Sequence, residues 1–385
     1  MSESRWSFGE QLGRRRRNVG VMVLLLATVA LSACGQTPNS APNTPAASSS
    51  PVPSPAATAA PVEQPGATVV QPTAPNVQPT AAAANTYSNP VYPYNFPDPF
   101  VLEVDGVYYA YATGDATKHY QTLTSKDLVS WEEGPDAMPQ FAAWVTGDSW
   151  APEVLRHSDG RYIMYYTAHS LELDKQCIGV ATSDKPLGPY VDSRTAPLVC
   201  QVDEGGSIDA NPFRNADGKL YLLWKNDGNC CGLPTYIYSQ RLSADGTKLT
   251  GKPVRLVQND AAWEGPLVEA PTLWRRDNRY YLFFSANAYY DETYAVGYAA
   301  CKGPLGPCKD APENPILSTE GEAVGPGHQA MIELPGGKTY FIYHAWPHDA
   351  VGSTLPGRVP WVDEVVWRDG KPVVQGPTSG PQPIP

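Results

Sequence analysis

Four acids and one histidine stand at similar places along the sequence, each shortly before a segment that is typical of a β-hairpin. They are Asp98, Glu153, Asp209, Glu269 and His328. Carboxyl groups around one pocket suit the cleavage of a glycosidic bond, because one can protonate the leaving oxygen while another activates water or attacks the anomeric carbon. Neighbouring carboxylates also repel each other, which can keep one of them protonated near neutral pH. The residues therefore predict this chemistry if the fold brings them together.

The elements that must position these residues are five hairpin motifs, which recur about 50–60 residues apart. Asp-Gly or a similar dipeptide between β-prone runs is a strong hairpin signal. Five such units without a long amphipathic helix predict an all-β, five-bladed β-propeller, with a tyrosine-rich β-sandwich as the alternative. In a propeller the five candidate residues would line one axial pocket, and the run 361–367 would supply late strands that close the ring. The hairpin tips are Asp105-Gly106, Asp159-Gly160, Asp217-Gly218, Asp277-Asn278 and Gly336-Gly337.

Three of the acids stand in sequence contexts that resemble glycoside hydrolase family 43, whose members are five-bladed propellers. Asp98 lies in Phe-Pro-Asp-Pro-Phe, Asp209 in Ser-Ile-Asp-Ala-Asn-Pro, and Glu269 in Glu-Ala-Pro. The resemblance covers roughly residues 87–374. It implies an inverting hydrolase in which Asp98 is the general base and Glu269 the general acid, while Asp209 orients the acid and tunes its pKa. The carboxyl groups of Asp98 and Glu269 would then stand roughly 6.5–9.5 Å apart.

Other residues are weaker candidates for contact with the sugar. Trp150 could stack on a sugar ring or belong to the core, and Phe96 is predicted to contact the substrate. Arg358 could match a late arginine of the family that reaches the substrate, or could lie on the surface.

His328, in Gly-Pro-Gly-His, resembles a family histidine that can hold a water-coordinated Ca²⁺ or Na⁺ in the central channel, although a lone histidine is more often simply hydrogen-bonded. The predicted reaction requires no cofactor. Glu153 is interpreted as a structural or pocket-rim residue, and His344 and Trp346 are further rim candidates.

The expected substrates are plant cell-wall polysaccharides that carry arabinofuranose or xylose. We favour α-L-arabinofuranosidase activity, then β-xylosidase, then endo-arabinanase, since a closed pocket would favour exo action and an open groove endo action. One alternative is a non-catalytic sugar-binding propeller at the cell surface, which would not need all three acids. Another is a propeller used for adhesion, which would expose a hydrophobic patch instead.

The charge of the chain argues against nucleic acid and anionic membrane surfaces as partners. The net charge is −11, and residues 1–33 carry five Arg and two Glu (+3), so the remainder is near −14. A protein with this charge repels polyanions, whereas a neutral sugar suits it. We expect a monomer.

The N-terminus resembles an export signal. Four arginines, 14–17, precede the apolar run 19–30, and Leu-Ser-Ala-Cys34 then resembles the bacterial lipoprotein box. The sequence therefore predicts a signal peptide at 1–33, a lipidated Cys34 with a stalk at 34–85, and a propeller at 86–385. The protein would be exported to the cell surface and touch the membrane only through its lipid, with ordinary secretion as the alternative. Residues 35–85 have no aromatic residue and one charge, so they cannot bury enough apolar surface to fold.

Six cysteines remain besides Cys34, an even number that fits disulfides in an oxidising compartment. Fifteen pairings of six cysteines are possible. Cys301 and Cys308 bracket a tight turn and form the best local pair, and Cys177 and Cys200 flank another hairpin. The adjacent residues Cys230 and Cys231 could then bond to each other.

Overall fold

The structure, a computed structural model, describes residues 85–385. The predicted signal peptide, Cys34 and almost all of the predicted stalk lie outside the described residues. Within this range the chain is nearly all β, and none of its helices is long and apolar enough to cross a membrane.

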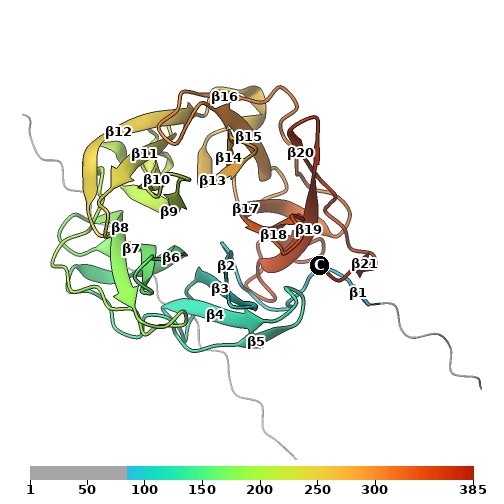
Figure 1. Ribbon diagram of the computed structural model, residues 1–385, viewed down its shortest axis with the longest axis horizontal. Helices are drawn as coiled ribbons and strands as arrows, with labels where there is room; N and C mark the ends of the chain where they lie inside the picture. Colours follow the sequence, from blue (N-terminus) through green and yellow to red (C-terminus); the bar gives the residue numbers. More distant parts are fainter. Residues whose placement is uncertain (1–84) are drawn as a thin grey trace, which may run out of the picture. The chain divides into compact units, whose positions relative to one another are not determined.

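Five antiparallel sheets stand around a common axis as the blades of a propeller (Figure 1). The sequence-based prediction of a five-bladed propeller is therefore confirmed, and the β-sandwich alternative is wrong. The first blade contains β2 (Phe100–Val104), β3 (Val107–Thr113), β4 (Tyr120–Ser125) and β5 (Trp131–Glu133). The second contains β6 (Val145–Arg156), β7 (Tyr162–Ser170) and β8 (Lys175–Ser183). The third contains β9 (Ser207–Arg214), β10 (Leu220–Asn226), β11 (Tyr236–Leu242) and β12 (Leu249–Gln258).

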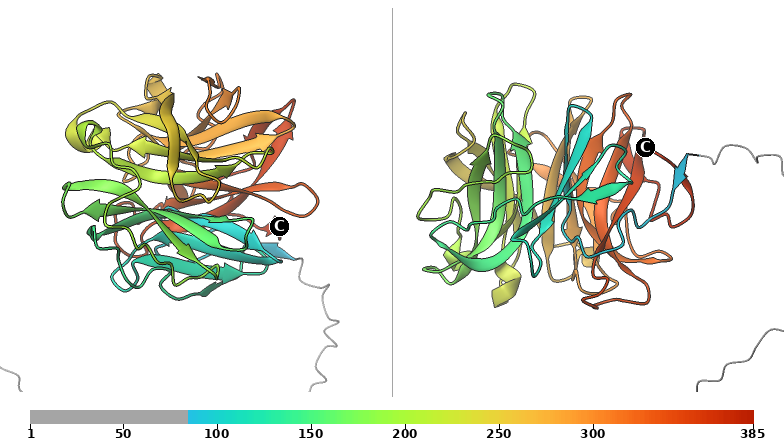
Figure 2. Two further views of the ribbon diagram at one scale, coloured as in Figure 1. Left: turned by 60° about the vertical axis from the view of Figure 1, so that its left-hand side comes forward. Right: turned by 90° about the horizontal axis from the view of Figure 1, so that it is seen from below.

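The fourth blade contains β13 (Val268–Arg276), β14 (Arg279–Ala286), β15 (Ala295–Cys301) and β16 (Cys308–Asp310). The fifth contains β17 (Ala323–Glu333), β18 (Thr339–Pro347), β19 (Val359–Arg368) and β20 (Lys371–Val374). The loops of the described range hold three short 3₁₀ helices: η1 (Val202–Glu204), η2 (Gly228–Cys231) and η3 (Ala262–Glu264). Side views show the strands running between two opposite faces of the ring, with the loops at those faces (Figure 2).

Each predicted hairpin tip joins the first and second strands of one blade. At the fourth tip, for example, Asp277 and Asn278 have φ values of 49° and 62°. A two-residue turn that matches the twist of its strands needs positive φ at both positions, and Asp, Asn and Gly adopt this conformation most readily. The first tip has the same form, with φ values of 54° at Asp105 and 82° at Gly106, whereas at the second and third tips only the glycine has a positive φ.

The hydrophobic core is divided among the seams between the blades. A cluster of buried residues lies between each pair of neighbouring blades, including the last blade and the first. Tyr111 and Tyr166, for example, are both fully buried in the seam between the first and second blades. Each blade is therefore stabilised by its neighbours on both sides, which holds the inner strands at fixed positions around the axis.

The ring is closed by the start of the described chain. β1 (Thr86–Tyr87) pairs with β21 (Gln382–Pro383), and the Val91 N–H donates to the Pro360 carbonyl at 3.0 Å. The side chain of Asn89 donates to the Val362 carbonyl and accepts from its N–H, both at 2.9 Å. The run 361–367, predicted to supply late strands, lies in β19, and its Val362 provides the two contacts with Asn89.

Among residues 85–385 three disulfides are present: Cys177–Cys200, Cys230–Cys231 and Cys301–Cys308. These are the pairs that the sequence predicted. The first joins β8 to the segment before η1, the third joins β15 to β16, and the second lies within η2.

Candidate active site

The inner strands carry a β-bulge at the same level in four blades. Strand pairing shifts register directly after Trp150, Ile208, Glu269 and Gly327. In the first blade the corresponding residues lie just before β2, where the Thr113 N–H donates to the Pro97 carbonyl at 3.1 Å. The first bulged residue has a positive φ, between 41° and 58°, in all five blades: Asp98, Ala151, Asp209, Ala270 and His328. Such a conformation is uncommon outside glycine and re-aims side chains at functional sites.

This register corrects the expectation that the five predicted residues are equivalent. Asp98, Asp209 and His328 do occupy the bulged position, but Glu269 lies one residue before it and Glu153 two residues after it. Glu153 is buried away from the pocket, where Asn211 donates to it at 2.7 Å. Burial raises the pKa of Glu153 well above its usual value. The structural interpretation of Glu153 therefore fits its surroundings.

The bulges are held by side chains of the preceding blade. The bulged N–H donates to the second strand of that blade in four cases: Ala151 to Thr113, Asp209 to Thr167, His328 to Ser285, and Asp98 to His344, at distances of 2.8–3.2 Å. In their own blades these four acceptors occupy the same position on the second strand, opposite the residue that precedes the bulge. The fifth such position holds Lys225, which cannot accept a hydrogen bond. The Ala270 N–H donates instead to the Asp209 carboxylate at 2.9 Å.

The pocket at the axis has a volume of about 480 Å³, within the range of small-ligand sites. Six of the residues that the sequence predicted line it, namely Asp98, Trp150, Asp209, Glu269, His328 and Arg358. Phe96 does not, because it is buried in the seam between the first and fifth blades and has no surface to offer a substrate.

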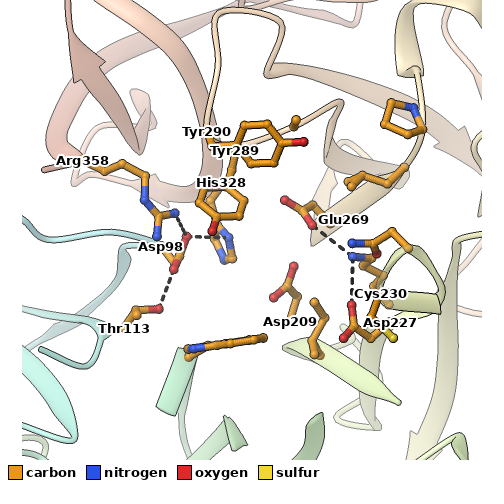
Figure 3. A pocket seen from close by; sticks show the side chains of 17 residues that line it. Asp98, Thr113, Asp209, Asp227, Cys230, Glu269, Tyr289, Tyr290, His328 and Arg358 are labelled. Carbon is orange, nitrogen blue, oxygen red and sulfur yellow. Dashed lines mark hydrogen bonds and ion pairs between the residues drawn. The ribbon is translucent and has the colours of Figure 1, made fainter. Parts of the chain in front are cut away.

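Asp98 lies on one side of the pocket among cationic and polar groups (Figure 3). Its Oδ1 is 2.7 Å from an Arg358 nitrogen and 3.3 Å from Nδ1 of His328, and its Oδ2 accepts from the Thr113 hydroxyl at 2.5 Å. Burial acts to raise the pKa of Asp98, but Arg358, His328 and the hydrogen bond from Thr113 outweigh it and hold the pKa below its usual range. Asp98 is therefore a carboxylate at neutral pH.

His344 was predicted to lie at the rim, but it is completely buried behind Asp98. Burial and the nearby Arg358 guanidinium lower its pKa well below the usual value, so its ring is neutral. A neutral ring can accept the Asp98 N–H at Nδ1, as observed. The other rim candidate, Trp346, does not line the pocket, and its indole N–H donates to the Tyr289 carbonyl at 2.8 Å.

Glu269 lies on the opposite side of the pocket from Asp98 (Figure 3). Its Oε2 is 3.1 Å from Nζ of Lys225, and its Oε1 accepts from the Tyr294 hydroxyl at 2.8 Å. Lys225 is fully buried and also lies 3.7 Å from a carboxylate oxygen of Asp227. These contacts fix the direction of the Glu269 carboxyl group.

Asp209 lies below Glu269 in the close view, across the pocket from Asp98 (Figure 3). Burial and the neighbouring Glu269 raise its pKa to about 6, although His328 and Lys225 oppose the shift. Its hydrogen bond to the Ala270 N–H connects it to the backbone immediately after Glu269. The carboxyl group of Asp209 can therefore orient Glu269 through the chain that carries it.

The sequence did not predict several residues that line the pocket. Lys225, Asp227, Cys230, Tyr289 and Tyr290 are among them. For Lys225 a signal existed, since it is a lone charge at the end of the apolar run Leu220–Trp224. A cation near His328 stays a prediction. Nδ1 of this histidine lies 3.3 Å from Asp98, so it already has one partner in the pocket.

The chain is similar to known glycosidases over most of the described range. The family model "Glycosyl hydrolases family 43" matches residues 87–372. An extracellular endo-α-(1→5)-L-arabinanase of Thermotoga petrophila is 31% identical, over 68% of this chain and 67% of that protein. A β-D-galactofuranosidase of Aspergillus niger is 29% identical, over 70% of this chain and 79% of that protein.

Among solved structures, a thermostable family-43 glycoside hydrolase has a TM-score of 0.72 and 34% identity, and the match covers 78% of this chain and 99% of that one. Together with the family match over most of the chain, this likeness confirms the resemblance carried by the three acids. The chain belongs to family 43 of the glycoside hydrolases.

Proposed function

We propose that the protein hydrolyses arabinofuranosyl or xylosyl linkages of plant cell-wall polysaccharide with inversion at the anomeric carbon. The observation that carries the proposal is the placement of Asp98 and Glu269 on opposite sides of one pocket, in different surroundings. Inversion requires a base that activates water on one face of the sugar and an acid that protonates the leaving oxygen on the other.

In this mechanism Asp98 accepts a proton from the attacking water, and its low pKa keeps it in the charged form that this step needs. Arg358 and the Thr113 hydroxyl hold its two oxygens, which aims the carboxylate at the pocket. Glu269 gives its proton to the glycosidic oxygen as the bond to the leaving group breaks. Tyr294 and Lys225 hold the Glu269 carboxylate that results. Asp209 orients the acid.

Among substrates we favour an α-L-arabinofuranoside, then a β-xyloside, then arabinan cut internally. The names of the two relatives, an arabinanase and a galactofuranosidase, support a furanoside. Trp150 and the partly exposed Tyr289 and Tyr290 offer aromatic surface for sugar faces. We further propose export with a lipid on Cys34, and action as a monomer. The word extracellular in the name of the Thermotoga relative supports export.

Hydrolysis of four substrates tests the proposal: aryl α-L-arabinofuranoside, aryl β-D-xyloside, arabinan and arabinoxylan. The wild type is expected to release sugar from at least one polysaccharide, and Glu269→Gln to lose most of that turnover while still binding sugar, because glutamine cannot donate the proton. Full activity of Glu269→Gln would contradict the assignment of the acid. Inactivity of the wild type on all four substrates, with sugar binding intact, would favour the non-catalytic sugar-binding propeller.

A further inference from the structure

Two adjacent cysteines form a disulfide at the edge of the pocket. Cys230 and Cys231 lie in η2, between β10 and β11, and Cys230 lines the pocket. Both residues are exposed. The bridge therefore presents two sulfur atoms and their neighbouring carbons to whatever enters the pocket from this side.

The disulfide lies on the side of the pocket that carries Glu269. Cys230 is next to Asp227 in the close view, whereas Asp98 is across the pocket (Figure 3). Asp227 contacts Lys225 at 3.7 Å, and Lys225 contacts Glu269 at 3.1 Å. In the proposed mechanism the leaving group departs from the side of the acid. The loop with the disulfide therefore flanks the path of the leaving group.

The backbone around the disulfide is fixed. The Cys230 N–H donates to the Asp227 carbonyl at 3.3 Å, and the Leu233 N–H donates to the Gly228 carbonyl at 2.9 Å. The Asn226 side chain donates to the Pro234 carbonyl at 3.0 Å, which holds the far end of the loop. A covalent bond between neighbouring residues removes further freedom, so little conformational entropy is left to lose when a ligand binds.

The surface of the bridge itself is apolar, and the polar side chain of Asn229 lines the pocket beside it. A disulfide has no N–H or O–H donor, and sulfur is soft and polarizable. Pro266 and Leu267 line the same pocket. A sugar ring has a face of C–H groups that packs well on such a surface, since both are removed from water without losing a hydrogen bond.

We propose that the Cys230–Cys231 disulfide is a wall of the leaving-group subsite and packs against the C–H face of the sugar that departs. The ligand is a neutral pentose or hexose ring within an oligosaccharide. This inference rests on the proposed function and extends it, because it names the surface that selects the sugar beyond the cleaved bond.

The test compares two substrates in a double variant, Cys230→Ser with Cys231→Ser. One substrate is a pentose oligosaccharide that the wild type cleaves, and the other is the corresponding glycosyl fluoride, which has no leaving-group sugar. The ratio of kcat/KM for the oligosaccharide to kcat/KM for the fluoride is expected to fall about tenfold, equivalent to about 1.4 kcal/mol. The matched control is Cys301→Ser with Cys308→Ser, which removes a disulfide outside this pocket and should keep the wild-type ratio.

A second double variant, Cys230→Ala with Cys231→Ala, distinguishes the effect of the apolar surface from the effect of the covalent bridge. Alanine keeps the surface apolar, so the ratio of the two kcat/KM values should fall less in the alanine variant than in the serine variant. If the bridge had a purely structural role, both variants would lose it equally and their ratios would be the same. An unchanged ratio in the serine variant, or equal ratios in the two variants, would overturn the subsite while leaving the proposed function intact. Failure of the wild type to cleave any of the four substrates that test the proposed function would overturn both proposals.

Discussion

At the scale of single residues, the three acids of the pocket differ in their surroundings more than in their chemistry. Asp98 faces Arg358 and two histidines, Glu269 faces Lys225 and Tyr294, and Asp209 is buried with no cationic side chain in hydrogen-bonding contact. The surroundings therefore shift the pKa of the two aspartates in opposite directions, below the usual range for Asp98 and up to about 6 for Asp209.

Asp98→Asn is expected to be almost inactive on polysaccharide, because an amide cannot accept a proton from water. Added azide should not restore turnover with a product of retained configuration, since an inverting enzyme forms no covalent intermediate. NMR of the anomeric proton in early product distinguishes the two configurations. A retained product, with or without azide, would show that the inverting mechanism is wrong.

Asp209→Asn is expected to gain stability relative to the wild type as the pH rises. Folding raises the pKa of Asp209 from 3.8 to about 6, so the folded protein holds this proton more tightly than the unfolded chain. The stability that this provides is fully present below pH 3.8 and is lost as the pH rises through about 6. Asparagine does not titrate, and its oxygen can still accept the Ala270 N–H.

Melting temperatures of the wild type and Asp209→Asn at pH 4 and pH 7.5 check this prediction. The difference, variant minus wild type, should be more positive at pH 7.5. A difference that does not change with pH would mean that the pKa of Asp209 is not raised by folding.

At the scale of elements, the second strand of each blade supports the inner strand of the next. Thr167 in β7 shows this plainly, because its hydroxyl accepts the N–H of Asp209 in β9 at 3.2 Å and the residue is fully buried. The position of a candidate catalytic acid thus depends on a side chain from another sheet.

Thr167→Val should destabilise the protein by about 1–3 kcal/mol, because the bulged N–H is left buried without an acceptor. Thr167→Ser, which keeps the hydroxyl and loses a methyl group, is the matched control and should lose less. Urea unfolding of the two variants measures the difference. If the valine variant were as stable as the serine variant, the hydrogen bond would contribute nothing to the bulge.

These elements also show how far the sequence could predict the site. The hairpins were predictable because Asp-Gly and related dipeptides satisfy a local backbone requirement. The acids at 98, 209 and 269 were recognisable from their neighbours in the chain. The register of the inner strands was not predictable, because the spacing of the hairpins does not reveal a bulge. Glu153 was therefore assigned to the bulged position, although it lies two residues after it. The contact of Lys225 with Glu269 joins residues 44 positions apart, which no local pattern encodes.

At the scale of the molecule, the ring depends on a short closing segment. Asn89 donates to the carbonyls of Val362 and Thr378 and accepts from the Val362 N–H, and it is buried. Asn89→Ala is expected to cost about 1–3 kcal/mol, because the Val362 N–H would remain buried without a partner, whereas the Val362 carbonyl keeps the Tyr87 hydroxyl. Thr378→Ala is the control, since that hydroxyl bonds within its own loop.

Urea unfolding and limited proteolysis of both variants test this account of ring closure. Within the described residues, the first cleavage in Asn89→Ala is expected to fall between Asn85 and Phe96, because fewer hydrogen bonds then join this segment to β19. Equal stability of the two variants would show that the seam between the first and fifth blades closes the ring without this segment.

The pairing of β1 with β21 has a further consequence for protein engineering. Because the two ends of the described chain lie side by side, a short linker between them would leave all five blades intact, and new termini could be opened at a hairpin tip such as Gly336-Gly337. Such a circular permutant keeps every contact around the pocket. The order of the blades along the chain would change, while their order around the axis would stay the same. We expect catalysis to depend only on the order around the axis.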